Sequence, residues 1–384
     1  MTQQTQVLVR TLPLSNGNYG GILQAYALQQ VLRELGLSPA TDLTISNPLP
    51  SIVVSANHAI ARVMPSWFTK WSGFAEVRDT VLTEKTSRTV MPFVDQHIVG
   101  VSVYDRRGTV DTSVVEQFDK VVVGSDQIWR RRYGDVGSFL ADFVTDPEVR
   151  IISYAASFGH DIPQGYGKQF TRKTRRLAQR FHSISVREAS AIDVCEKYWG
   201  VPALHHVDPT MLLSTEHYRK LAAENAAELT PQCLTYVLDE SAPSRSLVDR
   251  TCAELGMTPT KLFQRPMSYA AWREHPDEYQ QPTVQTWLKA FSDAEFIVTD
   301  SFHGTVFAIL NHKPFITINN SKRGSSRFDS LLDTFKLQER LVSPSVDDIK
   351  QVLSHEIDWQ YIDELLAEKR DEGLSYLRGA LLTN

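Results

Sequence analysis

The sequence predicts an α/β protein made of two Rossmann-like domains that face each other across a cleft. Short apolar strands alternate with helical patterns along the chain, which is typical of parallel sheets with helical crossovers. The 384 residues are long for one core and fit two domains. The alternation starts afresh in the second half. We therefore place the domains at residues 1–215 and 216–350, and expect C-terminal helices at 351–384 that pack back on the first domain.

The first half opens with an apolar strand at residues 7–12 and a turn rich in glycine and asparagine. The next segment has apolar residues at helical spacing and ends at Gly36, so it predicts a helix. Residues 38–110 mix Pro and Trp with short periodic pieces and predict only a few helices. Beyond them the pattern predicts three strands and then a helix, at residues 120–129, 151–159, 183–188 and 189–198.

The second half repeats the alternation. A turn at Asp208 and Pro209 is suited to a crossing between domains. Apolar runs then predict four strands, at residues 234–240, 258–264, 296–299 and 313–319. Helical patterns fill the intervals and the end of the chain, at residues 246–256, 283–294, 347–357 and 363–382.

Composition excludes several classes of protein. The net charge of −5 argues against general nucleic-acid binding, and the basic runs at residues 130–132 and 171–180 are interpreted as solvated faces. The three cysteines lack metal or disulfide spacing, which indicates a reducing compartment. The N-terminal segment does not resemble a signal peptide, and no apolar stretch is long enough to span a bilayer. We expect a cytoplasmic protein with at most peripheral membrane contact.

Residues 296–316 carry the clearest functional signal. An apolar strand runs directly into Asp300, Ser301 and His303, and then into an apolar helix. Open α/β sheets bind ligands at the carboxyl ends of their strands, and the N–H groups at a helix N-terminus are suited to an anion. The segment therefore predicts a phosphate or carboxylate site.

Seven motifs, in order, resemble the polysaccharide pyruvyl transferase family. They are NYGGILQAYALQQVL, VVVGSDQIW, ISYAASFG, ISVRE, HVDPTMLL, VTDSFHGTVFAILNHKPFI and RGSSRFDSLLDTFKL, within residues 7–340. The resemblance implies a GT-B-like architecture and transfer of pyruvate from phosphoenolpyruvate to a pair of sugar hydroxyls as a cyclic ketal. It also implies polysaccharide or exopolysaccharide biosynthesis in the cytoplasm, with or without contact with the inner face of the membrane. The acceptor, either lipid-linked or not, would be bound by the first domain and the donor by the second.

Ketal formation needs an acid to protonate the enol carbon and a base to accept a hydroxyl proton. His303 lies in a strand-to-helix turn and is the candidate acid, because histidine exchanges protons near neutral pH. Asp126 follows another strand and is the candidate base, with a helix N-cap as its alternative role. Asp300 would orient His303 or cap the helix. Asp208 is interpreted as a turn former in preference to a catalytic residue.

The doubly anionic donor calls for arginine, whose planar fork pairs with carboxylate and phosphate oxygens. Arg187 and Arg327 are the candidates, with structural salt bridges to Glu188 and Asp329 as the alternative. We add Ser301 and Gly304, at the start of the helix, to the predicted donor site. No organic cofactor and no metal are expected, because the acidic residues lack the close spacing of metal ligands.

The chain departs from the family pattern at one position. Better-studied members often have an Arg-Leu-His triplet where this chain has Ser301, Phe302 and His303. A serine hydroxyl does not replace a charge, so Arg327, Arg323 or Lys322 would have to compensate. A nucleotide-sugar glycosyltransferase and a non-catalytic glycan-binding relative therefore stay open as alternatives. On the acceptor side, the predicted contacts are Asn18, Tyr19, Gln127 and Trp129, with loop fixing as a second role for Asn18 and Tyr19.

Overall fold

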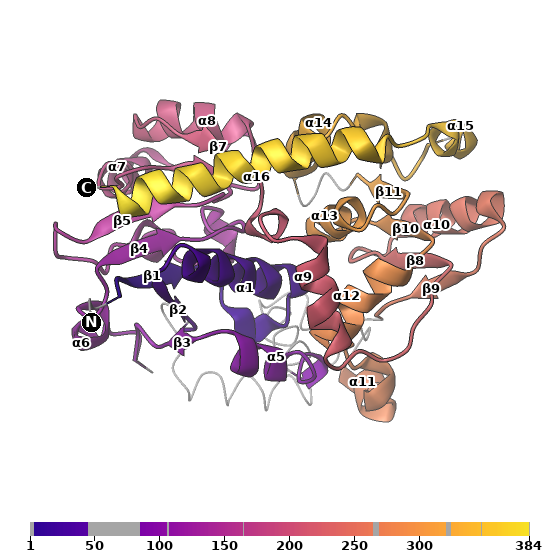
Figure 1. The fold of residues 1–384 in the computed structure, drawn as a ribbon, viewed down its shortest axis with the longest axis horizontal. Helices are drawn as coiled ribbons and strands as arrows, with labels where there is room; N and C mark the ends of the chain where they lie inside the picture. The colour runs from indigo at the N-terminus through magenta and orange to yellow at the C-terminus, as the bar shows by residue number, and fades with distance from the viewer. Residues whose placement is uncertain are drawn as a thin grey trace.

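The computed structural model describes residues 4–44, 85–105, 107–163, 165–263, 269–319, 324–346 and 348–383. Two parallel sheets lie side by side, one in each half of the chain, with helices packed around them (Figure 1). The predicted α/β class with two Rossmann-like domains is confirmed. Most of the poorly patterned stretch at residues 38–110 lies outside the described residues.

The first sheet has five parallel strands in the order β3-β2-β1-β4-β5. Their bounds are β1 (Gln6–Arg10), β2 (Ser38–Asp42), β3 (Gly100–Val101), β4 (Lys120–Val123) and β5 (Arg150–Ser153). Single bridges continue it to the pair β6 (Ser185–Val186) and β7 (Leu204–His205). The strand order reverses between β1 and β4, which is where such sheets bind ligands.

The second sheet has the order β12-β11-β10-β8-β9, also parallel throughout. Its strands are β8 (Cys233–Tyr236), β9 (Pro259–Lys261), β10 (Phe296–Thr299), β11 (Phe315–Ile318) and β12 (Leu341–Val342). Chain order reverses between β8 and β10, so this sheet has its own switch point. β10 and β11 are buried along their full length, as their continuous apolar runs predict.

Helices connect the strands in both domains. In the first domain they are α1 (Tyr19–Glu34), α5 (Met91–His97), α6 (Thr112–Val115), α7 (Lys168–Ala178) and α8 (Ser190–Val194). In the second they are α9 (Thr215–Ala223), α10 (Ala242–Leu255), α11 (Tyr269–Glu274), α12 (Val284–Asp293), α13 (Phe302–Leu310), α14 (Ser326–Thr334) and α15 (Ile349–Ser354). Short 3-10 or π turns lie between them, among them η4 (Cys195–Trp199) and η5 (Pro209–Met211). α16 (Trp359–Leu382) ends the chain.

β2 is a strand that its sequence does not suggest. It reads SPATD, without an apolar run and with a proline, which cannot donate a backbone hydrogen bond. Pro39 lies opposite Val7 of β1, while β3 on the other side pairs only with Thr41 and Asp42. Among the described residues, Pro39 therefore has a neighbouring strand on one side only. Tertiary pairing, not local pattern, makes this segment a strand.

The two domains share one apolar core. α1 is buried on nearly every side, and its residues form a single cluster with side chains of α12 and α13 in the second domain. Tyr19 stacks on Trp287 with ring centroids 5.5 Å apart, and its hydroxyl donates to the Pro282 carbonyl at 2.5 Å. The start of α1 is therefore fixed against the second domain.

α16 runs along both domains and ends beside the first sheet (Figure 1). Its Arg370 donates to the carbonyls of Met211 and Leu213, and the Tyr376 hydroxyl donates to the Ser153 carbonyl at 2.8 Å. Nearer its end, Ala380 accepts a hydrogen bond from Arg150. The helix thus ties the end of the chain to the first domain.

We expect Gly373→Ala to lower the free energy of unfolding by about 1–3 kcal/mol, the usual cost of overpacking. A methyl group at this position of α16 would lie 2.4 Å from the hydroxyl of buried Tyr154 and 2.9 Å from Leu212. Gly379 is the matched control on the same helix, because nothing lies within 4 Å of its added methyl. Gly379→Ala should be neutral or stabilising by up to about 1 kcal/mol. Equal effects in chemical denaturation would contradict the packing of α16 on the first domain.

Candidate active site

His303 extends from the second domain into the first. It lies in the first turn of α13, directly after β10, and is almost fully buried. Its ring covers Gly20 in the first turn of α1, where an added methyl group would lie 2.0 Å from Nδ1. Nε2 lies 3.4 Å from Oδ2 of Asp208, within ion-pair distance but without the alignment of a hydrogen bond. In enzymes, hydrogen bonds between catalytic residues are often this long in structures that contain no substrate.

Asp208 is the buried carboxylate on which the other groups converge. Its Oδ1 accepts hydrogen bonds from the amide and hydroxyl of Thr210, which begin the turn η5. Its Oδ2 accepts from Ser125 Oγ at 2.8 Å and from Arg187 Nη1 at 2.9 Å. Burial alone would raise the pKa of Asp208, but His303, Arg187 and the Thr210 amide outweigh it and hold the pKa well below its usual range. The carboxylate is therefore ionised.

Two buried arginines approach the same aromatic ring. The guanidinium of Arg187 lies 4.4 Å from the ring centroid of Phe302, and that of Arg327, from α14, lies 5.8 Å from it. Arg187 Nη2 is 3.7 Å from Oδ1 of Asp126. Burial and the charge of Arg187 lower the pKa of Arg327 to about 10. Two like charges held together away from water favour an anion between them.

Asp126 directly follows the turn after β4 and has a backbone φ of +89°, which is unusual for a residue other than glycine. Its Oδ1 accepts from the Gln127 amide at 2.8 Å, while its buried Oδ2 has no hydrogen-bond partner. A methyl group on Gly21 would lie 3.6 Å from this Oδ2 and 3.5 Å from the Asn18 amide nitrogen. The segment after Asp126 is a turn, so this residue caps no helix.

These five residues, Asp126, Arg187, Asp208, His303 and Arg327, form what we call the charge cluster. The four acidic and basic residues other than Asp208 were predicted from sequence, two as catalytic and two as donor-binding. They follow β4, β6 and β10 or begin α14, and all are more than nine-tenths buried. The carboxyl edges of the two sheets therefore meet here, beside the N-terminus of α1.

The remaining predicted donor residues have local packing roles. The Ser301 hydroxyl accepts from the Gly304 amide at 3.3 Å and so caps α13. A methyl group on Gly304 would lie 2.4 Å from the Thr299 hydroxyl oxygen, so glycine allows the helix to approach the end of β10. Lys322 and Arg323 lie outside the described residues. Of the three residues that could compensate for the missing arginine, Arg327 is therefore the one that the structure describes.

The structural alternative for Arg187 was a salt bridge to Glu188. Glu188 instead accepts hydrogen bonds from the amides of Phe158 and Gly159 at 2.8 and 3.0 Å. Burial raises its pKa. The ion pairs of Arg187 are with Asp208 and Asp126. Glu188 therefore fixes the turn after β5, and Arg187 is directed into the cluster.

The predicted acceptor residues separate into two groups. Asn18 is exposed at the N-terminus of α1 and forms no side-chain cap, and Gln127 lies beside Asp126 with its Oε1 accepting from Arg130. Trp129 is fully buried among aromatic side chains and donates to a backbone carbonyl. Tyr19 is buried against the second domain, which agrees with its loop-fixing alternative. Only Asn18 and Gln127 have side chains placed at the edge of the cluster.

The central role of Asp208 is the main feature that sequence reasoning missed. Its turn-forming role is present, but the same carboxylate also binds Arg187 and faces His303. Asp300, which was expected to orient His303 or cap the helix, accepts from the amides of Leu238 and Asp239 and anchors the loop after β8. The position of Asp208 in the sequence could have indicated its central role, because it follows a strand segment, as His303 does, and such residues gather at the carboxyl edges of the sheets.

We expect Gly20→Ala to displace the imidazole of His303, because the added methyl would overlap its ring atoms. The Cε1–H resonance of His303 should shift in nuclear magnetic resonance spectra, and any activity that uses this ring should fall. Gly21→Ala is the matched control in the same helical turn, where the added methyl meets only ordinary contacts of 3.5 Å or more. A His303 signal that is unchanged in Gly20→Ala would show that the ring does not lie over α1.

Comparison with solved structures and with known sequences gives the following matches. Structures similar to this chain include UDP-GlcNAc 2-epimerase from Neisseria meningitidis, bound to UDP-GlcNAc, with 8% identity over 99% of this chain and 100% of that chain and a TM-score of 0.50. The Methanocaldococcus jannaschii UDP-GlcNAc 2-epimerase has 11% identity over 99% and 100% and a TM-score of 0.49. MurG from Acinetobacter baumannii has 10% identity over 97% and 98% and a TM-score of 0.43.

At such low identity the likeness concerns the fold alone, which is GT-B-like. No curated protein matches the chain in sequence. Within the described ranges, no helix combines the length and apolar character needed to span a membrane. A sequence model of the family described as polysaccharide pyruvyl transferase matches residues 18–322, which is most of the chain and includes all of the charge cluster except Arg327. The chain therefore belongs to the polysaccharide pyruvyl transferase family.

Proposed function

We propose that the protein transfers the pyruvyl group of phosphoenolpyruvate to two hydroxyls of a sugar in a polysaccharide or glycan precursor. The observation that carries this proposal is that Arg187 has buried hydrogen-bond donors without partners in the described part of the chain. Its Nε and Nη2 are buried and have no hydrogen-bond partner among the described residues, although Nη1 is engaged by Asp208. Unsatisfied buried donors are costly, so an anionic ligand would complete them.

Phosphoenolpyruvate is suited to this place because it carries a carboxylate and a phosphate close together. The guanidinium groups of Arg187 and Arg327 both lie near the ring of Phe302, and each can pair with one of these groups. Ser301, at the position of the missing arginine, caps α13 and supplies no charge. In this proposal Arg327 compensates from α14, and the arginines neutralise the donor without a metal ion.

His303 would protonate the methylene carbon of the donor, which makes the neighbouring carbon electrophilic. Asp208 would hold the imidazole and stabilise its charged form, as a buried carboxylate does for a catalytic histidine. The first sugar hydroxyl attacks this carbon, phosphate leaves, and the second hydroxyl closes the ketal. One hydroxyl proton ends on the new methyl group and the other leaves with phosphate.

Asp126 is the proposed base for the attacking hydroxyl. Its Oδ2 is buried and lacks a hydrogen-bond partner, so it can accept a hydroxyl proton without first breaking another contact. Its left-handed backbone conformation is the kind of strain that clusters at functional sites. Asn18 at the start of α1 lies on the same side and would contact the acceptor sugar.

Mass spectrometry tests the proposal directly. The protein is incubated with phosphoenolpyruvate and a panel of sugars and glycan precursors, and each product is examined for the mass increase of one pyruvyl ketal with release of phosphate. Parallel reactions contain UDP-sugars in place of phosphoenolpyruvate. A glycosyl mass increase in those reactions, without any pyruvyl product, would favour the glycosyltransferase alternative and overturn the proposal.

We expect His303→Gln to reduce turnover by ~10²-fold or more, which is the typical contribution of general acid–base catalysis. The variant should remain folded, which thermal denaturation can verify. His312→Gln is the control, because His312 is exposed and pairs with Asp363 on α16, away from the charge cluster. Near-normal turnover of His303→Gln would remove this histidine from the chemical step.

A further inference from the structure

α7 carries a row of positive charges that the fold does not use. Lys168, Arg172 and Arg176 recur every four residues, so they lie on one face of the helix at intervals of about 6 Å. All three are exposed, and none forms an ion pair or hydrogen bond with another described residue. We call these three residues the basic stripe.

Neighbouring cations on α7 have structural partners, in contrast to the stripe. Lys173 pairs with Asp142 at 3.7 Å, and Arg175 donates to the carbonyls of Tyr198 and Lys197. On the buried side, Thr174 accepts a hydrogen bond from the indole of Trp199 at 3.1 Å. These contacts account for how α7 packs on the first domain, but they leave the stripe unexplained.

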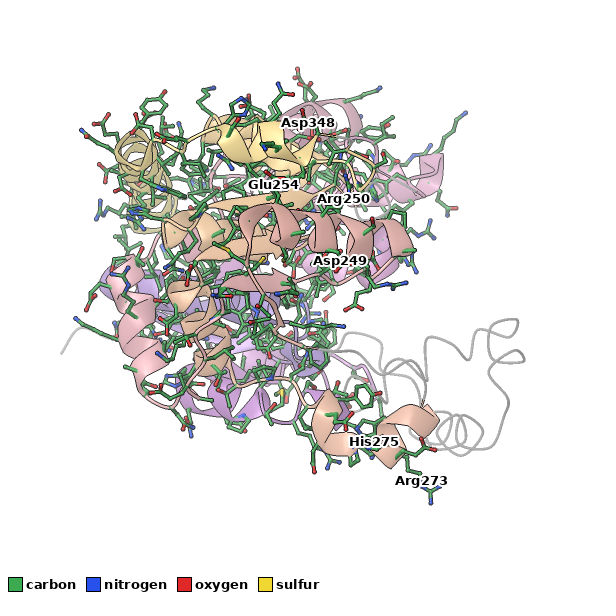
Figure 2. All side chains as sticks on the ribbon, turned by 90° about the vertical axis from the view of Figure 1, so that its right-hand side faces the viewer. Asp249, Arg250, Glu254, Arg273, His275 and Asp348 are labelled. Carbon is green, nitrogen blue, oxygen red and sulfur yellow. The ribbon has the colours of Figure 1, made fainter. Side chains whose placement is uncertain are left out.

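The basic stripe costs helix stability. Like charges four residues apart repel, and Lys168 places a cation at the positive end of the helix dipole. No acidic residue lies in the first turn, and Gly167 supplies no side-chain cap. A helix on the far side of the molecule shows the usual pattern. In α10, Arg250 and Glu254 are four residues apart with opposite charges, beside Asp249 (Figure 2).

The N-terminal end of α7 lies close to the segment that follows Asp126. Arg131, in the segment after β4 and Asp126, donates to the Gly165 carbonyl at 2.7 Å, and its guanidinium lies 4.7 Å from the Phe170 ring of α7. The segment from β5 to α7 also carries Ile162, whose side chain is 69% exposed. Arg131 thus links the segment that begins beside the charge cluster to the start of α7.

We propose that the basic stripe binds the surface of an anionic phospholipid membrane. A row of cations along one helix face matches a plane of phosphate headgroups, and the loop before α7 exposes Ile162, an apolar side chain of the kind that interfacial surfaces use. The stripe itself bears no aromatic ring for stacking on sugars or bases, which disfavours a glycan or a nucleic acid as its partner. Such binding would bring the site to acceptors whose lipid carrier lies in the same leaflet. This last step rests on the proposed function, whereas membrane binding does not.

Vesicle sedimentation tests the inference by measuring binding, without an assay of enzyme activity. We expect the protein to bind phosphatidylcholine vesicles that contain phosphatidylglycerol, to bind pure phosphatidylcholine weakly, and to dissociate at high salt. The combined variant Lys168→Gln, Arg172→Gln and Arg176→Gln should partition roughly a hundred-fold less onto the anionic vesicles. Its melting temperature should be unchanged or higher, because like-charge repulsion is removed, so unfolding would not explain the loss.

The matched control removes three exposed cations from the second domain, as Arg219→Gln, Lys220→Gln and Lys350→Gln. It should bind anionic vesicles like the unaltered protein. Failure of the unaltered protein to bind them, or equal loss in both variants, would overturn the inference. Binding to a soluble anionic polysaccharide but not to vesicles would also overturn it. A negative result in the ketal assay would leave these measurements valid.

Discussion

The site depends on one buried carboxylate, that of Asp208. It binds Arg187 and Ser125 from the first domain and faces His303 from the second, while Thr210 holds its other oxygen. A buried charge is tolerated only with such partners, and removing any of them would leave the rest uncompensated. The same ion therefore holds the guanidinium of Arg187, lies beside the imidazole of His303, and joins the two domains.

This arrangement follows from the sheets. Each domain has one point where the strand order reverses, between β1 and β4 in the first and between β8 and β10 in the second. α1 packs against both domains, so its N-terminus is held where these two points meet. Gly20 allows the imidazole of His303 to lie against the helix, which a larger residue would prevent. The apolar core thus sets the geometry of a charged site.

The sequence predicted the features that local pattern determines. The apolar runs of β4, β8, β10 and β11 and the glycine that ends α10 indicated strands and a helix end at the right places. β2 was missed because its strand character comes from its neighbour. Asp208 was interpreted only as a turn residue, because its contacts with Arg187 and His303 join segments far apart in the chain. For the same reason, burial of Trp129 in the aromatic core could not be predicted from its motif.

A double-mutant cycle between Asp208 and His303 tests the central claim most directly. Asp208→Asn removes the charge, and His303→Phe keeps a ring over Gly20 without a proton-carrying nitrogen. The free energy of unfolding is measured by equilibrium denaturation for the unaltered protein, both single variants and the double variant. The account predicts a coupling energy of about 0.5–3 kcal/mol, as for residues in one charged network. Effects that add to within about 0.5 kcal/mol would show that the two residues act independently, and would contradict it.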